Sequence, residues 1–234
     1  MNNIFTSHDP GQLIWQLLIP LLLLGSGIVV AWSPLKKFWA HSYLQRLIKH
    51  LGQDSLRHFS LMDGADMPLY IEYLILQPDG LLMLIVKPYR GNIFAAEKIE
   101  NWTQVIRHHS FKFPNPLHEL DTNLQALKGM FPKLKLKGMV VFTQGASFPK
   151  DKPRNVYDFE QLKALSGKSE KREVPESLRQ AWLKLREAAQ VDKNLHPVIL
   201  YQRGDKRRLL LGIFLLITCL IYTAGIFGLV KGVI

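Results

Sequence analysis

Glu72 and Lys87 are the two residues of this chain whose types and spacing point most directly to chemistry. They lie in two apolar segments, Leu69–Gln77 and Leu81–Lys87, which are separated by a short turn. A carboxylate can hold a magnesium ion, which lowers the pKa of an attacking water. A neighbouring lysine can orient that water or stabilise the charge that develops. Together these groups would suit the hydrolysis of a phosphodiester.

The position two residues before Lys87 decides how far that chemistry can go. Side chains two residues apart on a strand share one face of the sheet, so a carboxylate at this position would face the same phosphate as the lysine. Ile85 stands there and cannot bind a metal. Glu72 is then the candidate metal ligand, and the favoured interpretation is an ion pair between Glu72 and Lys87 on neighbouring strands. The alternative needs an acid from elsewhere in the chain, and the candidates are Glu97, Glu100 and Glu119.

The elements that would position these residues form an α/β pattern around a small mixed sheet flanked by helices. Pro78-Asp79-Gly80 is a turn signal between the two apolar segments, because proline presets φ and glycine accepts positive φ. The segment after this turn is apolar at nearly every position, as in strands buried on both faces. Five further elements are expected: a helix over 115–130, a strand over 138–143, a short strand and a helix over 156–165, and a helix over 175–190.

Several short sequences follow one another along this part of the chain. They are LGQ at 51–53, YIEYLILQPDGLLMLIVK at 70–87, PYRGNI at 88–93, Trp102, FPNPLHE at 113–119 and GMVVFT at 138–143. In this order they resemble the nuclease-related domain family, a branch of the PD-(D/E)XK nuclease superfamily. The resemblance implies a restriction-endonuclease-like fold. It also implies a site with a first-helix glutamate, an acid on one strand and a Glu-x-Lys sequence on the next.

Mapped onto that pattern, the site of this chain is degenerate. Gln53 stands where the family has the first-helix glutamate, and Glu72 stands where it has the strand acid. Ile85 occupies the acid position of Glu-x-Lys, while Lys87 retains the lysine. Glu119 replaces a glutamine that is usual in the family. No cofactor is therefore expected, and magnesium would be the cofactor of an active form.

Two uncharged apolar runs, Leu13–Ala31 and Leu209–Val230, enclose the domain. As α-helices they extend about 28 Å and about 33 Å, enough to cross a hydrocarbon core of about 30 Å. All but one of the 30 Lys and Arg residues, and all but one of the 19 Asp and Glu residues, lie between the runs. Because cations near spans favour the inner side, the sequence predicts a two-pass protein of the bacterial inner membrane. Both termini would be outside and the central domain would be cytoplasmic.

The predicted organisation has seven segments. They are an outer tail at 1–12, a transmembrane helix at 13–32, a basic juxtamembrane helix at 33–50, the nuclease-related domain at 51–165, a helical extension with a basic linker at 166–208, a transmembrane helix at 209–230 and an outer tail at 231–234. In the second run, Ala224, Gly228 and Gly232 are spaced for close helix contact, either between the two spans or between two copies of the chain.

The missing carboxylate favours a membrane-anchored protein whose domain has lost catalysis and acts as a cytoplasmic binding or scaffold module. Two alternatives remain open. One is an active divalent-metal-dependent nuclease on DNA or RNA with a relocated acid. The other is a non-cleaving nucleic-acid-binding protein, prompted by the net charge of +11. Expected partners are the membrane, DNA or RNA, and a protein partner or a second copy of the chain.

Overall fold

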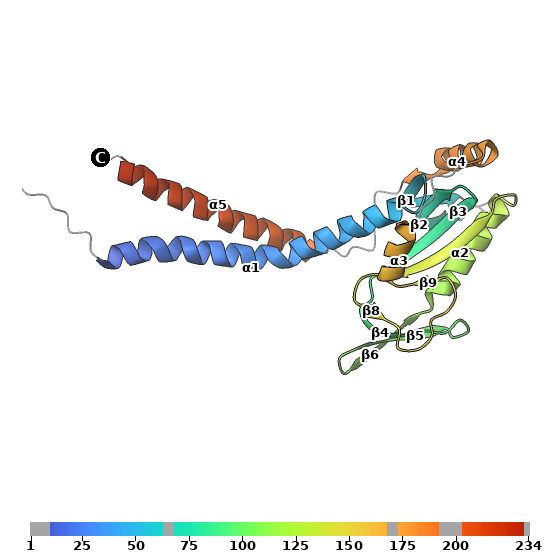
Figure 1. Cartoon of the computed structure of the whole chain (residues 1–234), viewed down its shortest axis with the longest axis horizontal. Helices are drawn as coiled ribbons and strands as arrows, with labels where there is room; N and C mark the ends of the chain where they lie inside the picture. Colours follow the sequence, from blue (N-terminus) through green and yellow to red (C-terminus); the bar gives the residue numbers. More distant parts are fainter. Residues whose placement is uncertain (1–9, 63–67, 168–172, 192–202, 232–234) are drawn as a thin grey trace, which may run out of the picture. The chain divides into compact units, whose positions relative to one another are not determined.

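The computed structural model describes residues 10–62, 68–167, 173–191 and 203–231, which fold into two compact units. The first unit comprises residues 1–42 and 200–234, and the second comprises residues 43–199 (Figure 1). Most of the predicted outer tails and of the basic linker lies outside the described residues.

Two long helices make up the first unit: α1 (Pro10–Lys49), whose last turns belong to the second unit, and α5 (Arg203–Lys231). Within Leu18–Lys49 of α1 and Gly204–Gly225 of α5, the most apolar stretch of 18 residues has a mean hydropathy of 2.0. Both helices are therefore long and apolar enough to cross a membrane. α1 is continuous through the segments predicted as a span and as a separate juxtamembrane helix.

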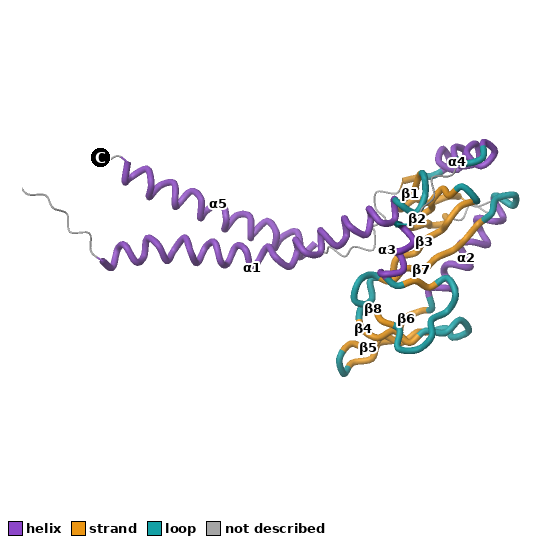
Figure 2. Tube along the Cα trace, in the orientation of Figure 1, coloured by secondary structure: helices purple, strands orange, loops and turns teal. Residues whose placement is uncertain are grey.

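Small residues allow α1 and α5 to approach closely where they run side by side (Figure 2). A Cβ atom added to Gly212 of α5 would lie 2.8 Å from Cβ of Ala31 and 3.0 Å from the carbonyl oxygen of Gly27, both in α1. Farther along the pair, Sγ of Cys219 donates a hydrogen bond of 3.3 Å to the carbonyl oxygen of Pro20. The close approach seen here involves Gly27, Ala31 and Gly212, whereas the surroundings of Gly228 and Gly232 in the predicted set lie outside the described residues.

At the other end of this helix pair, Lys37 and Asp205 form an ion pair. Nζ of Lys37 lies 2.9 Å from both carboxylate oxygens of Asp205, whose side chain is almost completely buried. Breaking a buried pair by removing one partner leaves an uncompensated charge. The pair therefore joins α1 and α5 at this end, where loss of either partner would destabilise the helix packing.

Replacing Gly212 by leucine is expected to separate the helices, because the new side chain has no room against the α1 backbone. Disulfide formation between Cys219 and a cysteine replacing Pro20 measures the packing. The yield is the fraction of chains whose two helices stay linked by the disulfide after a protease has cleaved the domain between them. We expect a severalfold lower yield in Gly212→Leu. The matched control is Gly225→Leu in the same helix, because a Cβ atom there meets nothing within 4 Å. Equal yields in the two variants would contradict the observed packing.

The second unit is built on a six-stranded mixed sheet with the order β10-β1-β2-β3-β7-β9. Its strands are β1 (Asp54–Met62), β2 (Pro68–Gln77), β3 (Gly80–Lys87), β7 (Leu136–Phe142), β9 (Val156–Tyr157) and β10 (Gln190–Val191). The β3–β7 and β7–β9 pairs are parallel, and the other pairs are antiparallel. The mixed α/β class, both predicted central strands and the third predicted strand are confirmed, whereas β1 was not predicted.

A second sheet, absent from the sequence prediction, has the order β6-β5-β4-β8. Its strands are β4 (Gly91–Phe94), β5 (Asn101–Ile106), β6 (His109–Pro114) and β8 (Ala146–Ser147). Figure 1 shows this smaller sheet beside one end of the larger one. Its β5–β6 hairpin turns through Arg107 and His108, and Arg107 has a left-handed φ of 55°.

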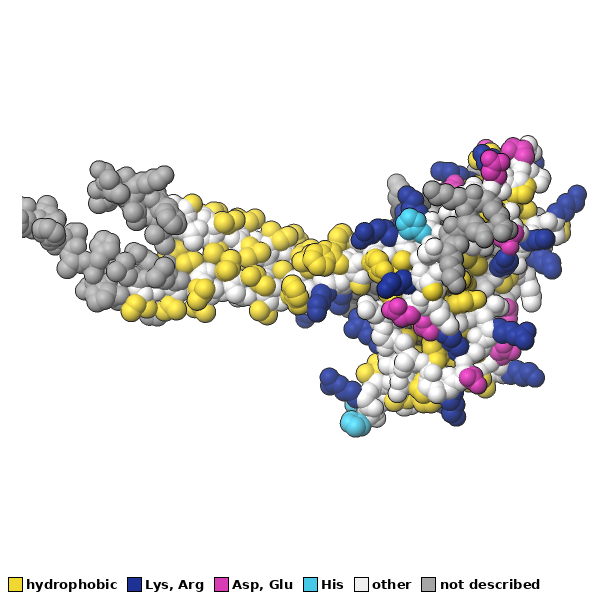
Figure 3. Space-filling model, in the orientation of Figure 1, with side chains coloured by type: hydrophobic (Ala, Val, Ile, Leu, Met, Phe, Trp, Pro, Cys, Tyr) yellow, Lys and Arg dark blue, Asp and Glu magenta, His cyan; other side chains and the backbone are white. Residues whose placement is uncertain are grey.

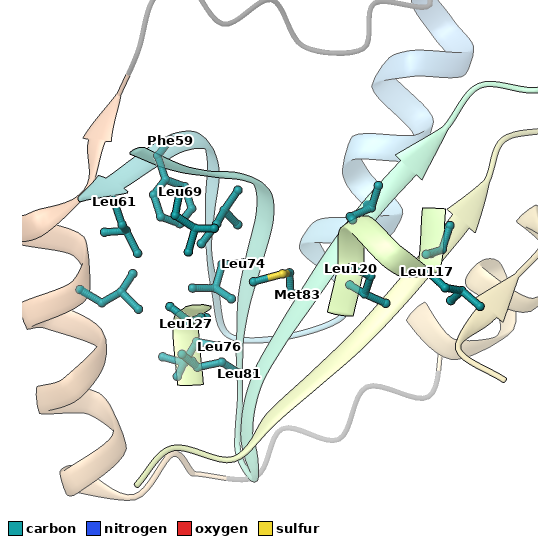
Figure 4. Close-up of a cluster of buried hydrophobic side chains, with 14 of the residues drawn as sticks. Phe59, Leu61, Leu69, Leu74, Leu76, Leu81, Met83, Leu117, Leu120 and Leu127 are labelled. Atoms are coloured by element: carbon teal, nitrogen blue, oxygen red, sulfur yellow. The ribbon is translucent and has the colours of Figure 1, made fainter. Parts of the chain in front are cut away.

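Three helices complete the second unit: α2 (Pro116–Met130), α3 (Phe159–Ser166) and α4 (Glu176–Ala188). They match the predicted helices. α2 crosses one face of the larger sheet, where it contacts β2, β3 and β7. Figure 4 shows Leu127 of α2 beside Leu76 and Leu81 of the two central strands, within the main buried cluster. On the opposite face, Leu82 of β3 borders a cavity together with Leu165 of α3 and with Leu51, which follows α1.

Candidate functional site

Glu72 lies in the middle of β2, where the sheet is locally interrupted on both sides. In the register of β1 with β2, the pairs Arg57–Tyr73 and Phe59–Ile71 are formed, but the pair between them is skipped. On the other side, the described β2–β3 pairing ends at Tyr73 and Leu84. Glu72 therefore sits at a split in the larger sheet, where a side chain can replace a backbone partner.

The carboxylate of Glu72 fills that role. Its Oε2 accepts a hydrogen bond of 2.8 Å from the backbone N–H of Val86 in β3. Glu72 is buried, with only 8% of its surface exposed. Because an unpaired buried N–H costs about 1–3 kcal/mol, the acid has a structural function that does not depend on a metal.

Burial also changes the protonation of Glu72. Desolvation raises its pKa from 4.5 to about 7, against the smaller lowering effects of the Val86 hydrogen bond and of Lys87. The negative charge of Glu119 raises the pKa further. Near pH 7 this carboxyl group is thus divided between its neutral and charged forms, which weakens it as a ligand for a hard cation.

Lys87, at the end of β3, pairs with Glu119 instead of with Glu72. Nζ of Lys87 lies 2.7 Å from Oε2 of Glu119, which is in the first turn of α2. The predicted ion pair between neighbouring strands is therefore corrected, because α2 lies over the face that Lys87 points toward and supplies a more accessible acid. The Glu119 side chain is 48% exposed, so the pair stabilises the fold by only about 0–1 kcal/mol.

The start of α2 is fixed by buried polar contacts, which place Glu119 beside the sheet. Asn115 caps the helix by accepting a hydrogen bond from the N–H of Leu117, and it is 3% exposed. Its amide nitrogen donates to the carbonyl oxygens of Glu97 and Ile99 at 3.0 and 2.9 Å. These contacts join the loop between β4 and β5 to the helix that carries Glu119.

Ile85 occupies a position where an added ligand would be buried. It is 2% exposed and belongs to the main hydrophobic cluster, together with Met83 and with Leu120 of α2. Alternation along β3 places it on the same face as Lys87. The residue that replaces the expected carboxylate is therefore a core residue, and the sheet face around it is apolar.

Gln53 does not reach this group. It follows the end of α1 and precedes β1, where its N–H donates to the carbonyl oxygen of Leu76 at 2.9 Å. Leu76 is four residues from Glu72 along β2, about 13 Å at the rise of a strand. The structure thus places Gln53 in a turn, not on the first helix that the resemblance implied, and away from Glu72.

The other two candidate acids lie in the loop between β4 and β5. Glu97 and Glu100 are exposed, and Oε1 of Glu97 accepts from the N–H of Arg154 at 3.4 Å. Of the three acids proposed to replace the missing ligand, the structure brings Glu119 to Lys87.

Two further residues join the site, and both were missed by the sequence analysis. Tyr70 lies two residues before Glu72, and burial raises its pKa to about 12, with added effects of Glu72 and Glu119. Its hydroxyl lies 2.8 Å from Nδ1 of His58, which has a left-handed φ of 48° in β1. The two-residue spacing to Glu72 was a usable signal for Tyr70, because it predicts a shared face. No such signal existed for His58, since β1 itself was not predicted.

The donor set does not fit a bound magnesium ion. Magnesium prefers carboxylate oxygens in a near-octahedral arrangement. Here one oxygen of Glu72 is used by Val86, and the Lys87 ammonium lies against Glu119. Within the described ranges, no group of three or more His, Cys, Asp or Glu residues could hold a metal.

The larger sheet also borders an open cavity of about 720 Å³ at the turn between β2 and β3. Its lining includes Gln77, Asp79 and Lys137, but neither Glu72 nor Lys87. Asp79 and Lys137 form an ion pair, which lowers the pKa of Asp79. This cavity and the Glu72 group are therefore separate features of the domain.

Fold and site together define a mixed α/β domain that is carried between two helices long enough to cross a membrane. Residues 35–143 match the model of the family described as the nuclease-related domain. The chain thus contains a nuclease-related domain, which confirms the resemblance seen in the sequence. Searches of curated proteins and of solved structures found no match.

Proposed function

We propose that this chain is a two-pass membrane protein whose nuclease-related domain binds or scaffolds other molecules in the cytoplasm and does not cleave nucleic acid. The observation that carries the proposal is Ile85, a core residue at the position of a metal-binding acid. The surviving groups support it. Glu72 satisfies the backbone of Val86, and Lys87 is paired with Glu119.

The membrane part of the proposal rests on α1 and α5 and on the charges near them. Lys36 and Lys37 follow the first apolar run, and Lys206, Arg207 and Arg208 precede the second. Because such flanking cations remain on the inner side, the domain lies in the cytoplasm and both termini lie outside, in a bacterial inner membrane.

A nuclease assay on the full chain in detergent tests the loss of catalysis. Supercoiled DNA, linear DNA and RNA are incubated with the protein and either magnesium or manganese, and cleavage is followed on gels. We expect the parent chain to cleave no more nucleic acid than the Lys87→Ala variant prepared in the same way. Glu72→Gln is the second control, since glutamine keeps an oxygen for the Val86 N–H. Cleavage by the parent chain that both substitutions abolish would refute the proposal.

One contact favours a second candidate function, a divalent-metal-dependent nuclease on DNA or RNA. Glu119 lies 2.7 Å from Lys87 and is close enough to Glu72 to raise its pKa. It would then replace the missing acid. In that case Glu119→Gln removes the cleavage as completely as Lys87→Ala, while the exposed-acid control Glu187→Gln retains it.

A further inference from the structure

The tip of the β5–β6 hairpin presents apolar side chains to solvent. Ile106 and Phe111 lie on the same face of the hairpin, and they are 40% and 52% exposed. The same face continues inward to Trp102 and Phe113, which are buried in the main cluster. The hairpin therefore projects its apolar face beyond the core that it helps to form.

Cations lie near these side chains, in the turn and on the opposite face of the hairpin. Arg107 and His108 form the exposed turn, and Lys112 is exposed on β6. Arg90 lies at the same end of the sheet, because the neighbouring Gly91 packs against the backbone of Val105. Figure 3 shows cationic and histidine side chains next to each other at this end of the smaller sheet.

The sheet itself carries no opposing charge. None of the strands β4, β5, β6 and β8 contains Asp or Glu. The carboxylates of Glu97 and Glu100 precede β5, and the length of that strand places them about 17 Å from the tip. The tip thus combines exposed apolar area with positive charge, the pattern of segments that rest on anionic lipid headgroups.

We propose that the tip of the β5–β6 hairpin contacts the anionic surface of the bilayer that anchors the chain. The inference rests on the membrane anchoring proposed above. Only a short turn separates the end of α1 at Lys49 from β1. On the other side, residues 192–202 connect β10 to α5 and can extend at most about 40 Å. The first apolar run ends at Ala31 and α1 continues to Lys49, about 27 Å farther along the helix, so the two connections limit the distance from the domain to the bilayer and raise the effective concentration of a weak contact.

A bilayer explains the composition of the tip better than nucleic acid does. Phosphate contacts of nucleic acids need cations along an extended path, and their affinity depends on many of them. The fixed cations near the tip are Arg107 in the turn, Arg90 beside it and Lys112 on the opposite face of the hairpin from Ile106 and Phe111. Exposed aliphatic and aromatic side chains gain little from a phosphate backbone, whereas they gain from the acyl boundary of a membrane.

An environment-sensitive probe on the full chain tests the contact. In a Cys219→Ser background, a cysteine replaces His108 and is labelled with a nitrobenzoxadiazole dye. The chain is placed in nanodiscs of phosphatidylcholine alone or of equal parts phosphatidylcholine and phosphatidylglycerol. We expect a blue shift and about a twofold rise in emission in the anionic discs, reversed by salt because the charges become screened.

Two variants identify the groups responsible. Arg107→Asn with Lys112→Gln removes two cations while asparagine suits the left-handed φ of Arg107. The binding constant of the tip for the anionic surface is expected to fall about thirtyfold, since each basic residue contributes to it separately. Phe111→Ser removes the apolar anchor and should abolish the blue shift. Leu183→Ser on α4 is the control, because Leu183 is also exposed, at 49%, and should leave the shift intact.

The results separate this proposal from the ones on which it rests. Chains that enter the discs but show the same emission in both lipids would overturn the hairpin contact and leave the anchoring standing. A shift of equal size for a probe at Leu183 would overturn it as well. A response to duplex DNA in zwitterionic discs, without a response to anionic lipid, would assign the tip to nucleic acid instead. Chains that fail to enter discs at all would overturn both the anchoring and the contact.

Discussion

Replacing Ile85 by glutamate, which restores the Glu-x-Lys sequence, is expected to destabilise the domain by about 3–5 kcal/mol at neutral pH. Ile85 is 2% exposed and packs in the main cluster. A carboxyl group there would lose its hydration, and the apolar contacts of the isoleucine side chain would be lost. Urea unfolding of the full chain in detergent, followed by tryptophan fluorescence, measures the change. We therefore expect the restored motif to weaken the fold before it can restore a reaction.

The control for this substitution is Ile85→Val, which removes one methyl group and is expected to cost about 0.5–1.5 kcal/mol. The destabilisation by glutamate should also grow with pH. Burial raises the pKa of the new carboxyl group in the folded state, so the folded protein loses stability as pH rises from the unfolded pKa through the folded one. Unchanged stability together with metal-dependent cleavage in Ile85→Glu would show that the site is closer to an active one than we propose.

Glu72 is expected to make the wild-type domain less stable at pH 8 than at pH 5. Its pKa is about 7 in the folded protein and 4.5 in the reference state. Because the pKa of Glu72 is higher in the folded protein than in the unfolded one, its contribution to the stability of the fold is complete below pH 4.5. This contribution is lost as pH rises through 7. The shift corresponds to a loss on the order of 2–3 kcal/mol. In Glu72→Gln this decline should disappear, because glutamine does not titrate and still accepts from the Val86 N–H.

Unfolding at pH 5 and at pH 8 provides the measurement for Glu72. Glu187→Gln on the exposed face of α4 is the control and should keep the wild-type pH dependence. Asp79 and Asp158 have pKa values lowered by their lysine partners, so they stay charged over this range and add no slope. A decline that persists unchanged in Glu72→Gln would mean that another group titrates.

The larger sheet could be predicted where local signals agree with the fold. Pro78-Asp79-Gly80 does form the turn between β2 and β3, and Gly80 has a φ of 150°. Asn115 and the following proline mark the start of α2, where Asn115 caps the helix. These positions are readable because turn and cap chemistry depends on neighbours in the sequence.

The smaller sheet could not be found in the same way. Its strands are short, and the β5–β6 turn uses Arg107 and His108 instead of the glycine or asparagine that usually signal such hairpins. Arg107 accepts a left-handed conformation there at some cost in free energy. Tertiary packing of Trp102 and Phe113 in the core compensates for a turn that local propensity does not favour.

The residues of the candidate site could be named from the sequence, but their contacts could not. The motif identified Glu72, Ile85 and Lys87, yet the partner of Lys87 depends on where α2 crosses the sheet. That placement follows from long-range packing and from the loop held by Asn115. Gln53 was misplaced for a related reason: the helix before it ends at Lys49, and the chain has already turned toward β1.

The hydrogen bond between Val86 and Glu72 has a consequence for how the history of such a domain is read. If the backbone of a neighbouring strand requires an acid, selection for folding would keep that acid whether or not a reaction depends on it. A descendant would then keep half of an ancestral motif without any of its chemistry. The presence of this acid in a related chain would therefore indicate common ancestry alone. Catalytic activity would be indicated only if a second metal ligand were present with it.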